Sequence, residues 1–279
     1  MMLTLQGAQM LQMLENALRK SLPESLKVYG TVFHMNRGNP FKLKALVDKW
    51  PDFNTVIIHP EEQVSYQMWN ECAFVFLRAE CLPMSSRLGS QSSLNEVIQS
   101  LAATKAFNVK QTQCFLFVMP ETAKRLVPSL VDAKNVSSTS GRPKAINQEE
   151  FKLSSLDITH AALVNKFWHF GGNERSQRFI ERCIRTFPTF CLLGPERSPV
   201  SWTLMDQTGE LRMAGTVPQY RAQGLISSVI YSQIQALDKL GFPLYAHTDK
   251  SHKIMQKMSY NLQHIQMPCD WNQWNCVPL

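Results

Sequence analysis

Several sequence patterns that mark common enzyme classes are missing from this chain of 279 residues. It contains no Gly-x-Ser-x-Gly, Walker A or Gly-x-Gly-x-x-Gly pattern, which disfavours serine hydrolases and the nucleotide enzymes that use those loops. Its seven cysteines form no Cys-x-x-Cys pair and no cluster with histidine at zinc-finger spacing, so we expect no metal site. The odd cysteine count argues against a closed disulfide framework and favours buried thiols in a reducing compartment.

Long apolar runs and clusters of basic residues are absent as well. The longest apolar stretches, 72–77 and 114–119, are far shorter than the roughly 20 residues of a membrane helix, so we expect no membrane insertion. Lys and Arg exceed Asp and Glu by 29 to 22, a net charge of +7, yet no basic run is longer than two residues. This dispersed excess favours small anionic partners such as phosphates or CoA and disfavours nucleic acid.

The amino end has no basic region ahead of an apolar block, so no secretory signal is predicted. Its apolar residues recur at helical spacing from Leu5 to Leu18 and are followed by Arg19 and Lys20. This pattern is typical of either an amphipathic import signal or a first core helix, and we favour the core helix.

The composition is globular, with 44% hydrophobic and 18% charged residues, and alternating helical and extended patterns predict an α/β (α+β) fold. In the first half, the β-branched and aromatic stretch 27–34 favours an extended segment. Asn39 and Pro40 predict a capped helix over 40–47. Further patterns predict a buried strand over 55–59, a helix over 93–107, a strand over 113–119 and a helix from 121. Residues 64–90 fit neither pattern.

A stretch rich in Ser, Thr, Gly and Pro predicts a linker between two domains, which we place at 1–135 and 148–279 with the linker at 136–147. The second domain is predicted to contain helices and strands in turn. They are helices over 159–170 and 173–187, strands over 190–193 and 200–205, a turn at 206–209, a strand over 210–217, a helix over 224–240, a strand over 243–248 and a helix over 251–263.

The most informative stretch is 211–232: an apolar strand, a short loop containing Arg221 and Gly224, and an apolar helix. Such a loop presents backbone N–H groups at a helix N-terminus, where the positive end of the helix dipole attracts a phosphate. Glycine at 224 lets the backbone approach an anion closely. Arg-x-x-Gly alone also fits an ordinary strand-to-helix turn, and its position after a hairpin favours the functional interpretation.

This strand, loop and helix resemble the acyl-CoA pyrophosphate motif of the GNAT superfamily, (Gln/Arg)-x-x-Gly-x-(Gly/Ala), with Ile226 as a departure at the last position. Almost the whole chain resembles the glycine N-acyltransferase family. The resemblance is carried by stretches such as LQGAQMLQMLE from Leu5, FWHFGGNERSQRFIERCI from Phe167 and DWNQWNCVPL at the end. It implies a family-specific α/β N-terminal domain and a C-terminal GNAT-type domain with a mixed sheet.

The resemblance also implies a function. Acyl-CoA would be the cosubstrate, and a benzoyl or related group would pass to glycine by direct attack of the amine, without an acyl-enzyme and with no permanently bound cofactor. The protein would be a monomer of the mitochondrial matrix that acts in amino acid conjugation and detoxification. Backbone groups of Thr216 and Val217 would line the pantetheine, and N–H groups of the strand would polarise the thioester carbonyl. The pyrophosphate would be held by the turn of Arg221, Ala222, Gln223, Gly224 and Leu225.

Two departures bear on activity. The family carries a carboxylate, usually glutamate, between Pro218 and Tyr220, where it resembles a general base, whereas this chain has Gln219. An amide accepts no proton near neutral pH, so we expect reduced turnover. Residues 64–90 also differ from the family, which has a longer and more acidic segment there.

Three further groups of residues are candidates. His247 and Asp249 end a predicted strand, and they are either a replacement base or ordinary loop polarity. Arg175 is a candidate to bind the carboxylate of the acceptor amino acid through a bidentate contact, whereas its neighbour Asn173 is expected to cap a helix. Trp271 and Trp274 either line an aromatic acyl pocket or, as we favour, pack in the core.

Two other functions stay open on the sequence alone. Gln219 favours a paralogue that binds acyl-CoA with little or no turnover. A second alternative is an acyltransferase that uses another amino acid, such as glutamine, as its acceptor.

Overall fold

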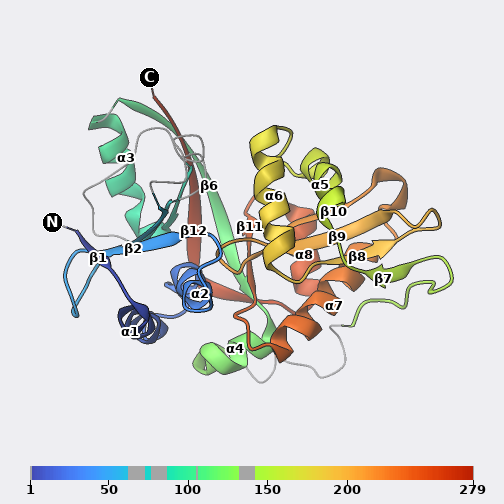
Figure 1. The fold of residues 1–279 in the computed structure, drawn as a ribbon, viewed down its shortest axis with the longest axis horizontal. Coiled ribbons are helices and arrows are strands. Elements are labelled where there is room, and N and C mark those ends of the chain that lie inside the picture. Colours follow the sequence, from blue (N-terminus) through green and yellow to red (C-terminus); the bar gives the residue numbers. More distant parts are fainter. Residues whose placement is uncertain (1, 62–72, 77–86, 105, 132–141, 279) are drawn as a thin grey trace. The chain divides into compact units, whose positions relative to one another are not determined.

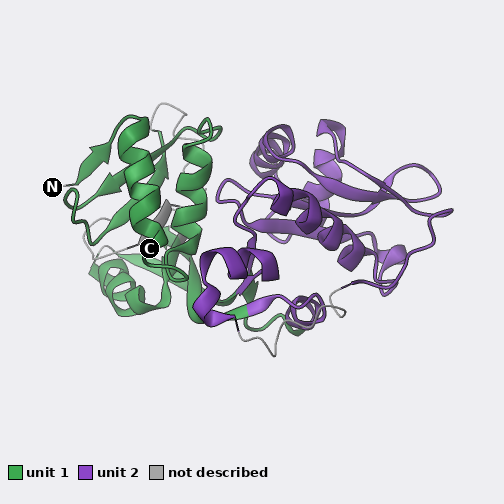
Figure 2. Cartoon of the chain, turned by 90° about the horizontal axis from the view of Figure 1, so that it is seen from below, with its two compact units in different colours: residues 1–116, 247–253, 266–279 green, residues 117–246, 254–265 purple. Residues whose placement is uncertain are grey.

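The structure is a computed structural model that describes residues 2–61, 73–76, 87–104, 106–131 and 142–278. Contacts divide the chain into two compact units (Figure 2). The N-terminal unit comprises 1–116, 247–253 and 266–279, and the C-terminal unit comprises 117–246 and 254–265. Most of the unassigned stretch 64–90 lies outside the described residues. Among the described residues, no helix combines the length and apolarity needed to cross a bilayer.

An eight-stranded mixed sheet forms the framework of the N-terminal unit, in the order β1-β2-β3-β4-β5-β12-β6-β11 (Figure 1). The first four strands pair antiparallel in sequence order, whereas β4 and β5 are parallel. β12 pairs antiparallel with β5, so the last strand of the chain lies inside a sheet begun by the first. The strands are β1 (Leu3–Leu5), β2 (Leu43–Val47), β3 (Val56–Pro60), β4 (Ala73–Phe76), β5 (Arg87–Gln91), β6 (Phe107–Val118), β11 (Tyr245–Asp249) and β12 (Ile265–Pro278).

Three helices of the N-terminal half test the predictions made there. α1 (Ala8–Arg19) and α3 (Asn95–Thr104) confirm the predicted helices, and Leu14 and Leu18 of α1 are buried in the core. The extended segment predicted over 27–34 is wrong, because these residues form α2 (Leu26–Met35). Every residue of α2 is buried, so tertiary burial around the whole helix overrides the weak β-preference of its branched and aromatic side chains.

The helix predicted over 40–47 is also wrong, since this segment contains strand β2. Alternate residues of β2 are buried, and the strand pairs with both β1 and β3, which is the period of a strand and not of a helix. Asn39 does not cap a helix. Its side-chain amide donates to the Leu43 carbonyl at 2.8 Å and its side-chain oxygen accepts from the Leu43 N–H at 2.8 Å, which fixes the loop that enters β2.

A four-stranded sheet in the order β10-β9-β8-β7 forms the framework of the C-terminal unit, and its pairs are antiparallel. Helices α5 and α6 lie on one face and α7 on the other (Figure 1). The elements predicted between 159 and 263 are confirmed within a few residues. They are α5 (Ala161–Phe167), α6 (Glu174–Thr186), β8 (Phe190–Leu193), β9 (Pro199–Met205), β10 (Leu211–Thr216), α7 (Leu225–Lys239), β11 and α8 (Lys253–Asn261). Helix α4 (Pro120–Leu126) and strand β7 (Lys152–Ser154), which was not predicted, precede them.

The two halves of the chain repeat one topology. The order β1-α1-α2-β2-β3-β4 matches β7-α5-α6-β8-β9-β10, and in both runs consecutive strands are antiparallel neighbours. The next step is parallel in both, as the β4–β5 pairing in the first and as a bridge between Glu210 and Tyr245 in the second. The predicted linker separates the two runs. The domain boundaries at 135 and 148 stay a prediction, since the compact units are divided by contacts and at other positions.

Candidate active site

β10 is an edge strand of the four-stranded sheet, and it is irregular in its middle. Its pairing with β9 shifts register between Arg212 and Gly215, and Met213 has a left-handed φ of 55°. A bulge of this kind bends the strand and takes peptide groups out of the hydrogen-bond ladder. A Cβ at Gly215 would lie 2.8 Å from the Trp202 indole, so only glycine fits against that ring.

Thr216 ends β10 with its backbone groups directed at the open edge of the sheet. The Val217 N–H donates to the Val200 carbonyl at 2.9 Å, and antiparallel alternation then points the Thr216 N–H and C=O away from β9. The Thr216 carbonyl accepts from Arg221 Nε at 3.1 Å. The Val217 carbonyl accepts from the Tyr220 N–H at 2.9 Å, so both backbone groups of Val217 are already bonded. Of the two residues predicted to line the pantetheine, Thr216 and Val217, Thr216 is therefore the one whose N–H is available to a ligand.

Gln219 lies in a single turn of 3-10 helix, η5 (Pro218–Tyr220), directly after β10. Its side chain is exposed, whereas the next residue, Tyr220, is half-buried. The Tyr220 ring meets Phe151 edge-to-face at 5.9 Å between centroids. Tyr220 thus anchors the turn to the core, and Gln219 stays at its surface.

The predicted phosphate loop follows η5 and ends at the N-terminus of α7. Ala222 and Gly224 have left-handed backbones, with φ of 64° and 76°, and Gly224 is the N-cap residue of α7. Alternating left- and right-handed residues gather N–H groups on one side of a turn, and the first-turn N–H groups of a helix have no acceptor within it. A Cβ placed at Gly224 would meet nothing within 4 Å, so the space beside it is open.

The loop between α5 and α6 is fixed by the buried side chain of Asn165. Its Oδ1 accepts from the Gly172 N–H at 2.9 Å and from Ser176 Oγ at 2.6 Å, and its Nδ2 donates to the Asn173 carbonyl at 3.0 Å. Asn173 is the predicted N-cap of α6, since its Oδ1 accepts from the Ser176 N–H at 2.9 Å. Arg175 lies half-buried in the first turn of α6, beside this fixed loop.

A buried polar cluster holds the start of β10 beside the start of β11. Asp206 accepts from the Thr208 N–H at 2.9 Å and pairs with Arg212 at 3.2 Å, and its side chain is only 1% exposed. The Tyr245 hydroxyl donates to the Thr208 carbonyl at 2.7 Å. Burial, followed by the charges of Glu210 and Asp206, raises the pKa of Tyr245, which keeps this donor protonated. The cluster fixes the point from which the bulged strand departs.

His247, Asp249 and the two tryptophans belong to the N-terminal unit, whereas Gln219 and Arg175 belong to the C-terminal unit. His247 packs beside Trp271, with ring centroids 5.6 Å apart. Asp249 accepts from the Ser251 N–H at 2.7 Å and from Ser251 Oγ at 2.8 Å, which closes a local turn. Trp271 and Trp274 are 2% and 1% exposed, so the core interpretation of both is confirmed.

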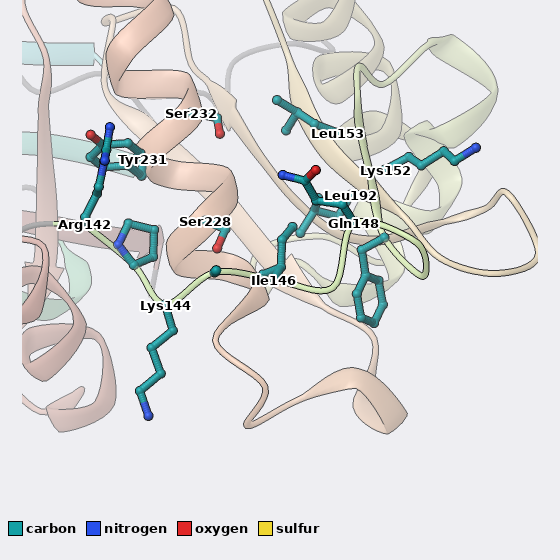
Figure 3. A pocket seen from close by; sticks show the side chains of 13 residues that line it. Arg142, Lys144, Ile146, Gln148, Lys152, Leu153, Leu192, Ser228, Tyr231 and Ser232 are labelled. Atoms are coloured by element: carbon teal, nitrogen blue, oxygen red, sulfur yellow. The ribbon is translucent and has the colours of Figure 1, made fainter.

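A cavity of about 670 Å³ lies in the C-terminal unit, between α7 and the segment 142–153. In Figure 3 this segment crosses α7 near Ser228, and the side chains of Lys144 and Lys152 extend away from the cavity. None of the cavity's lining residues belongs to 216–225, although Phe151 of its lining packs on Tyr220 of η5.

The cysteines of the described residues are mostly buried thiols. Within the described ranges, no three His, Cys, Asp or Glu side chains are grouped to hold a metal ion. Cys114, Cys183, Cys191 and Cys276 are buried free thiols, and burial raises the pKa of Cys191 to about 11. Such thiols are poor nucleophiles near neutral pH.

Sequence reasoning missed the bulge in β10 and the aromatic run at 167–170. A bulge leaves no sequence signal at Met213, because the left-handed residue there is not glycine. The aromatic run was detectable as FWHF followed by two glycines, a composition that is unusual for a helix connection.

Searches among curated proteins find relatives that span the whole chain. A Bos taurus protein named glycine N-phenylacetyltransferase is 63% identical over 295 residues, and Homo sapiens glycine N-acyltransferase is 63% identical over 296. A Mus musculus glycine N-acyltransferase-like protein is 62% identical over 296 residues. Each alignment covers 100% of both chains. Since this chain has 279 residues, the relatives contain residues that it lacks.

Solved structures share the fold at low sequence identity. A Drosophila protein has a TM-score of 0.74 at 11% identity, with 98% of this chain and 97% of that chain covered. A GCN5-related N-acetyltransferase-like protein from Streptococcus suis has a TM-score of 0.54 at 12% identity, covering 97% and 100%. A tandem GNAT protein from the clavulanic acid biosynthesis pathway has a TM-score of 0.53 at 10% identity, covering 98% of each chain. The predicted GNAT-type fold is therefore confirmed.

Two family models together match most of the chain. The model described as "Aralkyl acyl-CoA:amino acid N-acyltransferase" matches residues 2–77 and 86–188, and its C-terminal-region model matches 190–278. The mismatch with the family is thus narrower than the predicted 64–90, since only 78–85 is left unmatched there. The chain belongs to the aralkyl acyl-CoA:amino acid N-acyltransferase family and is an acyltransferase whose cosubstrate is acyl-CoA.

Proposed function

We propose that the protein transfers an aralkyl acyl group from acyl-CoA to the amino group of glycine, and that the site is built on β10, η5 and the N-terminus of α7. The observation that supports this most is the sequence of a bulged edge strand, an exposed turn and a glycine-capped helix. Bovine and human relatives named for glycine acylation are 63% identical over the full length of both chains, which supports the choice of acceptor.

Each part of this arrangement has a chemical role in the proposal. The Thr216 N–H at the open edge of β10 donates to the pantetheine, which takes the place of a neighbouring strand. The turn of Arg221, Ala222, Gln223, Gly224 and Leu225 holds the pyrophosphate with the N–H groups that follow Arg221, whose own N–H donates to the Pro218 carbonyl, and with the positive end of the α7 dipole. Peptide N–H groups at the bulge polarise the thioester carbonyl and stabilise the oxyanion that forms as the amine attacks.

Arg175 is proposed to hold the carboxylate of the acceptor amino acid. It lies in the first turn of α6, where the helix dipole adds to the attraction of a guanidinium for an anion. The Asn165 hydrogen bonds fix the loop that leads into this turn, so the arginine is held on an ordered backbone. Because this backbone is already ordered, an acceptor amino acid bound by Arg175 is held in place before it reacts.

Gln219 occupies the position where the family resemblance implies a general base. Glycine is mainly an ammonium ion near neutral pH, and only the neutral amine attacks a thioester. A side-chain amide orients the amine through hydrogen bonds but removes no proton. The proposal therefore includes slow turnover near neutral pH, with deprotonation left to solvent.

A thiol-release assay tests the proposed reaction. We expect CoA release from benzoyl-CoA or phenylacetyl-CoA that depends on added glycine and is faster with glycine than with glutamine, alanine or no amino acid. Release that depends on glutamine instead would replace the acceptor in the proposal. Absence of amino-acid-dependent release at any pH would overturn it.

Gln219 also favours a second candidate function, a paralogue that binds acyl-CoA with little or no turnover. Calorimetry with benzoyl-CoA separates the two, because the binding paralogue gives tight binding without release of thiol in the presence of any amino acid. The proposal of an enzyme requires both binding and glycine-dependent release.

The cellular setting is proposed from the family resemblance as the mitochondrial matrix, with the protein acting as a monomer in amino acid conjugation. Fractionation of cells that express the chain tests the compartment. Light scattering at several concentrations tests the oligomeric state, where a constant mass of about one chain supports the monomer.

A further inference from the structure

The aromatic residues at the end of α5 form a connected cluster in the C-terminal unit. Trp168 stacks on Phe179 with ring centroids 6.0 Å apart and meets Phe170 edge-to-face at 5.8 Å. Phe179 is buried at 9% exposure, whereas Trp168 and Phe170 are half-buried and so keep part of their ring surface accessible. The cluster has a fixed base and an incompletely covered outer surface.

This cluster is joined to β10, the strand proposed to polarise the thioester. The Arg212 guanidinium lies 6.0 Å from the centre of the Phe170 ring, and Arg212 is itself held by the buried carboxylate of Asp206 at 3.2 Å. Phe167 packs on Trp202 at 5.8 Å, and Trp202 lies against Gly215 of β10. Two independent contacts therefore attach the aromatic run to the bulged part of β10.

The backbone that carries the aromatic run is ordered by its own sequence. A Cβ at Gly171 would lie 2.1 Å from the Asn165 carbonyl oxygen, and Gly172 has a φ of 92°, so both glycines are required for the tight path after Phe170. The Asn165 hydrogen bonds close this path onto α6. A surface held in this way loses little conformational entropy when a ligand packs on it.

We propose that Trp168 and Phe170 form an aromatic wall that selects the acyl group of the substrate, with the aryl ring of an aralkyl acyl-CoA packing on their accessible faces. The proposal rests on the proposed function, because it places the thioester at β10. Aromatic rings attract one another in stacked and edge-to-face arrangements beyond the area that they bury, by about 0.5–1.5 kcal/mol a pair. An aliphatic acyl chain of similar size gains the burial without this addition.

The inference is tested by the ratio of two substrates in single variants. Phe170→Leu and Trp168→Leu should each lower kcat/KM for phenylacetyl-CoA relative to hexanoyl-CoA by about threefold to tenfold, the range that one aromatic pair supplies. A loss of fold or of catalytic groups lowers kcat/KM for both substrates alike, so the ratio of the two values reports only acyl selection. Trp168→Phe, which keeps a ring, should retain most of the ratio and serves if the leucine variant at 168 does not fold.

Tyr231→Leu is the matched control, since Tyr231 is a half-buried ring of α7, on the opposite face of the sheet from α5, and lines the cavity there. It should leave the ratio unchanged. An unchanged ratio in both wall variants, or a change in Tyr231→Leu that exceeds theirs, overturns the aromatic wall while glycine-dependent thiol release in the parent protein still upholds the proposed function. Absence of that release in the parent protein is the separate outcome that overturns the function itself.

Discussion

The two halves of this chain share one topology and differ at the crossover between the fourth and fifth strands. In the C-terminal half 28 residues, 217–244, connect β10 to β11, and they contain the predicted phosphate loop and the whole of α7. In the N-terminal half ten residues, 77–86, connect β4 to β5. The N-terminal connection is therefore 18 residues shorter than the C-terminal one.

This difference supports the proposal that the C-terminal half carries the acyl-CoA site. A glycine-capped helix after a strand supplies the N–H groups and dipole that bind a pyrophosphate, and the crossover is where such a helix belongs. The stretch that the family model leaves unmatched, 78–85, lies within the short crossover. We infer that the N-terminal unit acts as scaffold and that the C-terminal unit binds one acyl-CoA per chain.

The largest effect is expected from restoring a carboxylate in the C-terminal crossover. Gln219→Glu should raise the rate of thiol release at pH 7 by at least about tenfold, because a general base typically contributes ~10² to 10⁴ in rate. It should also flatten the rise of rate with pH, since the glutamate takes over the task left to hydroxide and to the free amine. Steady-state assays from pH 6.5 to 9 measure both.

Gln235→Glu is the control for this change, because Gln235 is exposed on α7 and lies outside the proposed site. Its rate should equal that of the parent protein. A Gln219→Glu variant no faster than the parent at pH 7 would mean that another group is the base or that proton transfer does not limit turnover.

A smaller effect is expected at the acceptor side of the same unit. Arg175→Ala should raise the KM for glycine by roughly tenfold to a hundredfold, the value of a lost charge-assisted contact, and should change the KM for acyl-CoA much less. Arg178→Ala removes an exposed ion pair with Glu174 on the same helix and should leave both constants near those of the parent. Equal changes in both KM values for Arg175→Ala would assign this residue a structural role.

A comparison of glycines tests the crossover itself. Gly224 has a φ of 76°, so a β-branched residue would strain the backbone, whereas asparagine tolerates this conformation. Gly224→Asn should weaken acyl-CoA binding severalfold in calorimetry by placing a side chain where the pyrophosphate packs. Gly38→Asn makes the same change in a left-handed, open position of the N-terminal unit and should leave binding unchanged. Equal affinity of the two variants would remove the loop from the site.

A fourth prediction compares how acid affects the stability of the two units. Burial, aided by Arg37 in the case of His34, lowers the pKa of His34 and of His264 from 6.5 to about 4. The folded protein then binds fewer protons than the unfolded chain below pH 6.5, so stability falls as the pH drops toward 4. At pH 5 each imidazole should cost about 2 kcal/mol.

The variants His34→Phe and His264→Phe separate these two contributions. Each should lose less stability than the parent between pH 7 and pH 5 in denaturant unfolding, because one titrating group has been removed. An identical loss in parent and variants would show that neither histidine controls the acid response.

The sequence predicted the C-terminal unit well and the N-terminal unit less well, for a physical reason. Strands and helices from 159 to 263 alternate with clear caps and turns, such as Asn173 before α6 and Gly224 before α7, so local signals agree with the tertiary fold. In α2 and β2 they disagree. The uniform burial of α2 leaves no apolar face that repeats with the period of a helix. Before β2, Asn39 is a residue type that commonly caps helices, but its side chain bonds the Leu43 backbone and fixes a loop instead.

The candidate site was predictable where it depends on backbone chemistry and not where it depends on long-range contacts. The predicted phosphate loop is recognisable in the sequence from Gly224 and the helix that follows it. The bulge at Met213, the bond from the Val217 N–H to Val200 and the attachment of Phe170 to Arg212 depend on contacts between different elements. No spacing along one chain encodes such contacts.

Hydrogen exchange in the presence and absence of benzoyl-CoA tests the central claim most directly. The account predicts that the ligand slows amide exchange in peptides from β10 through the first turn of α7, residues 211–228, and leaves peptides covering β5 and α3, residues 87–104, unchanged. Protection confined to 87–104, or equal protection of both regions, would contradict the assignment of the acyl-CoA site to the C-terminal crossover.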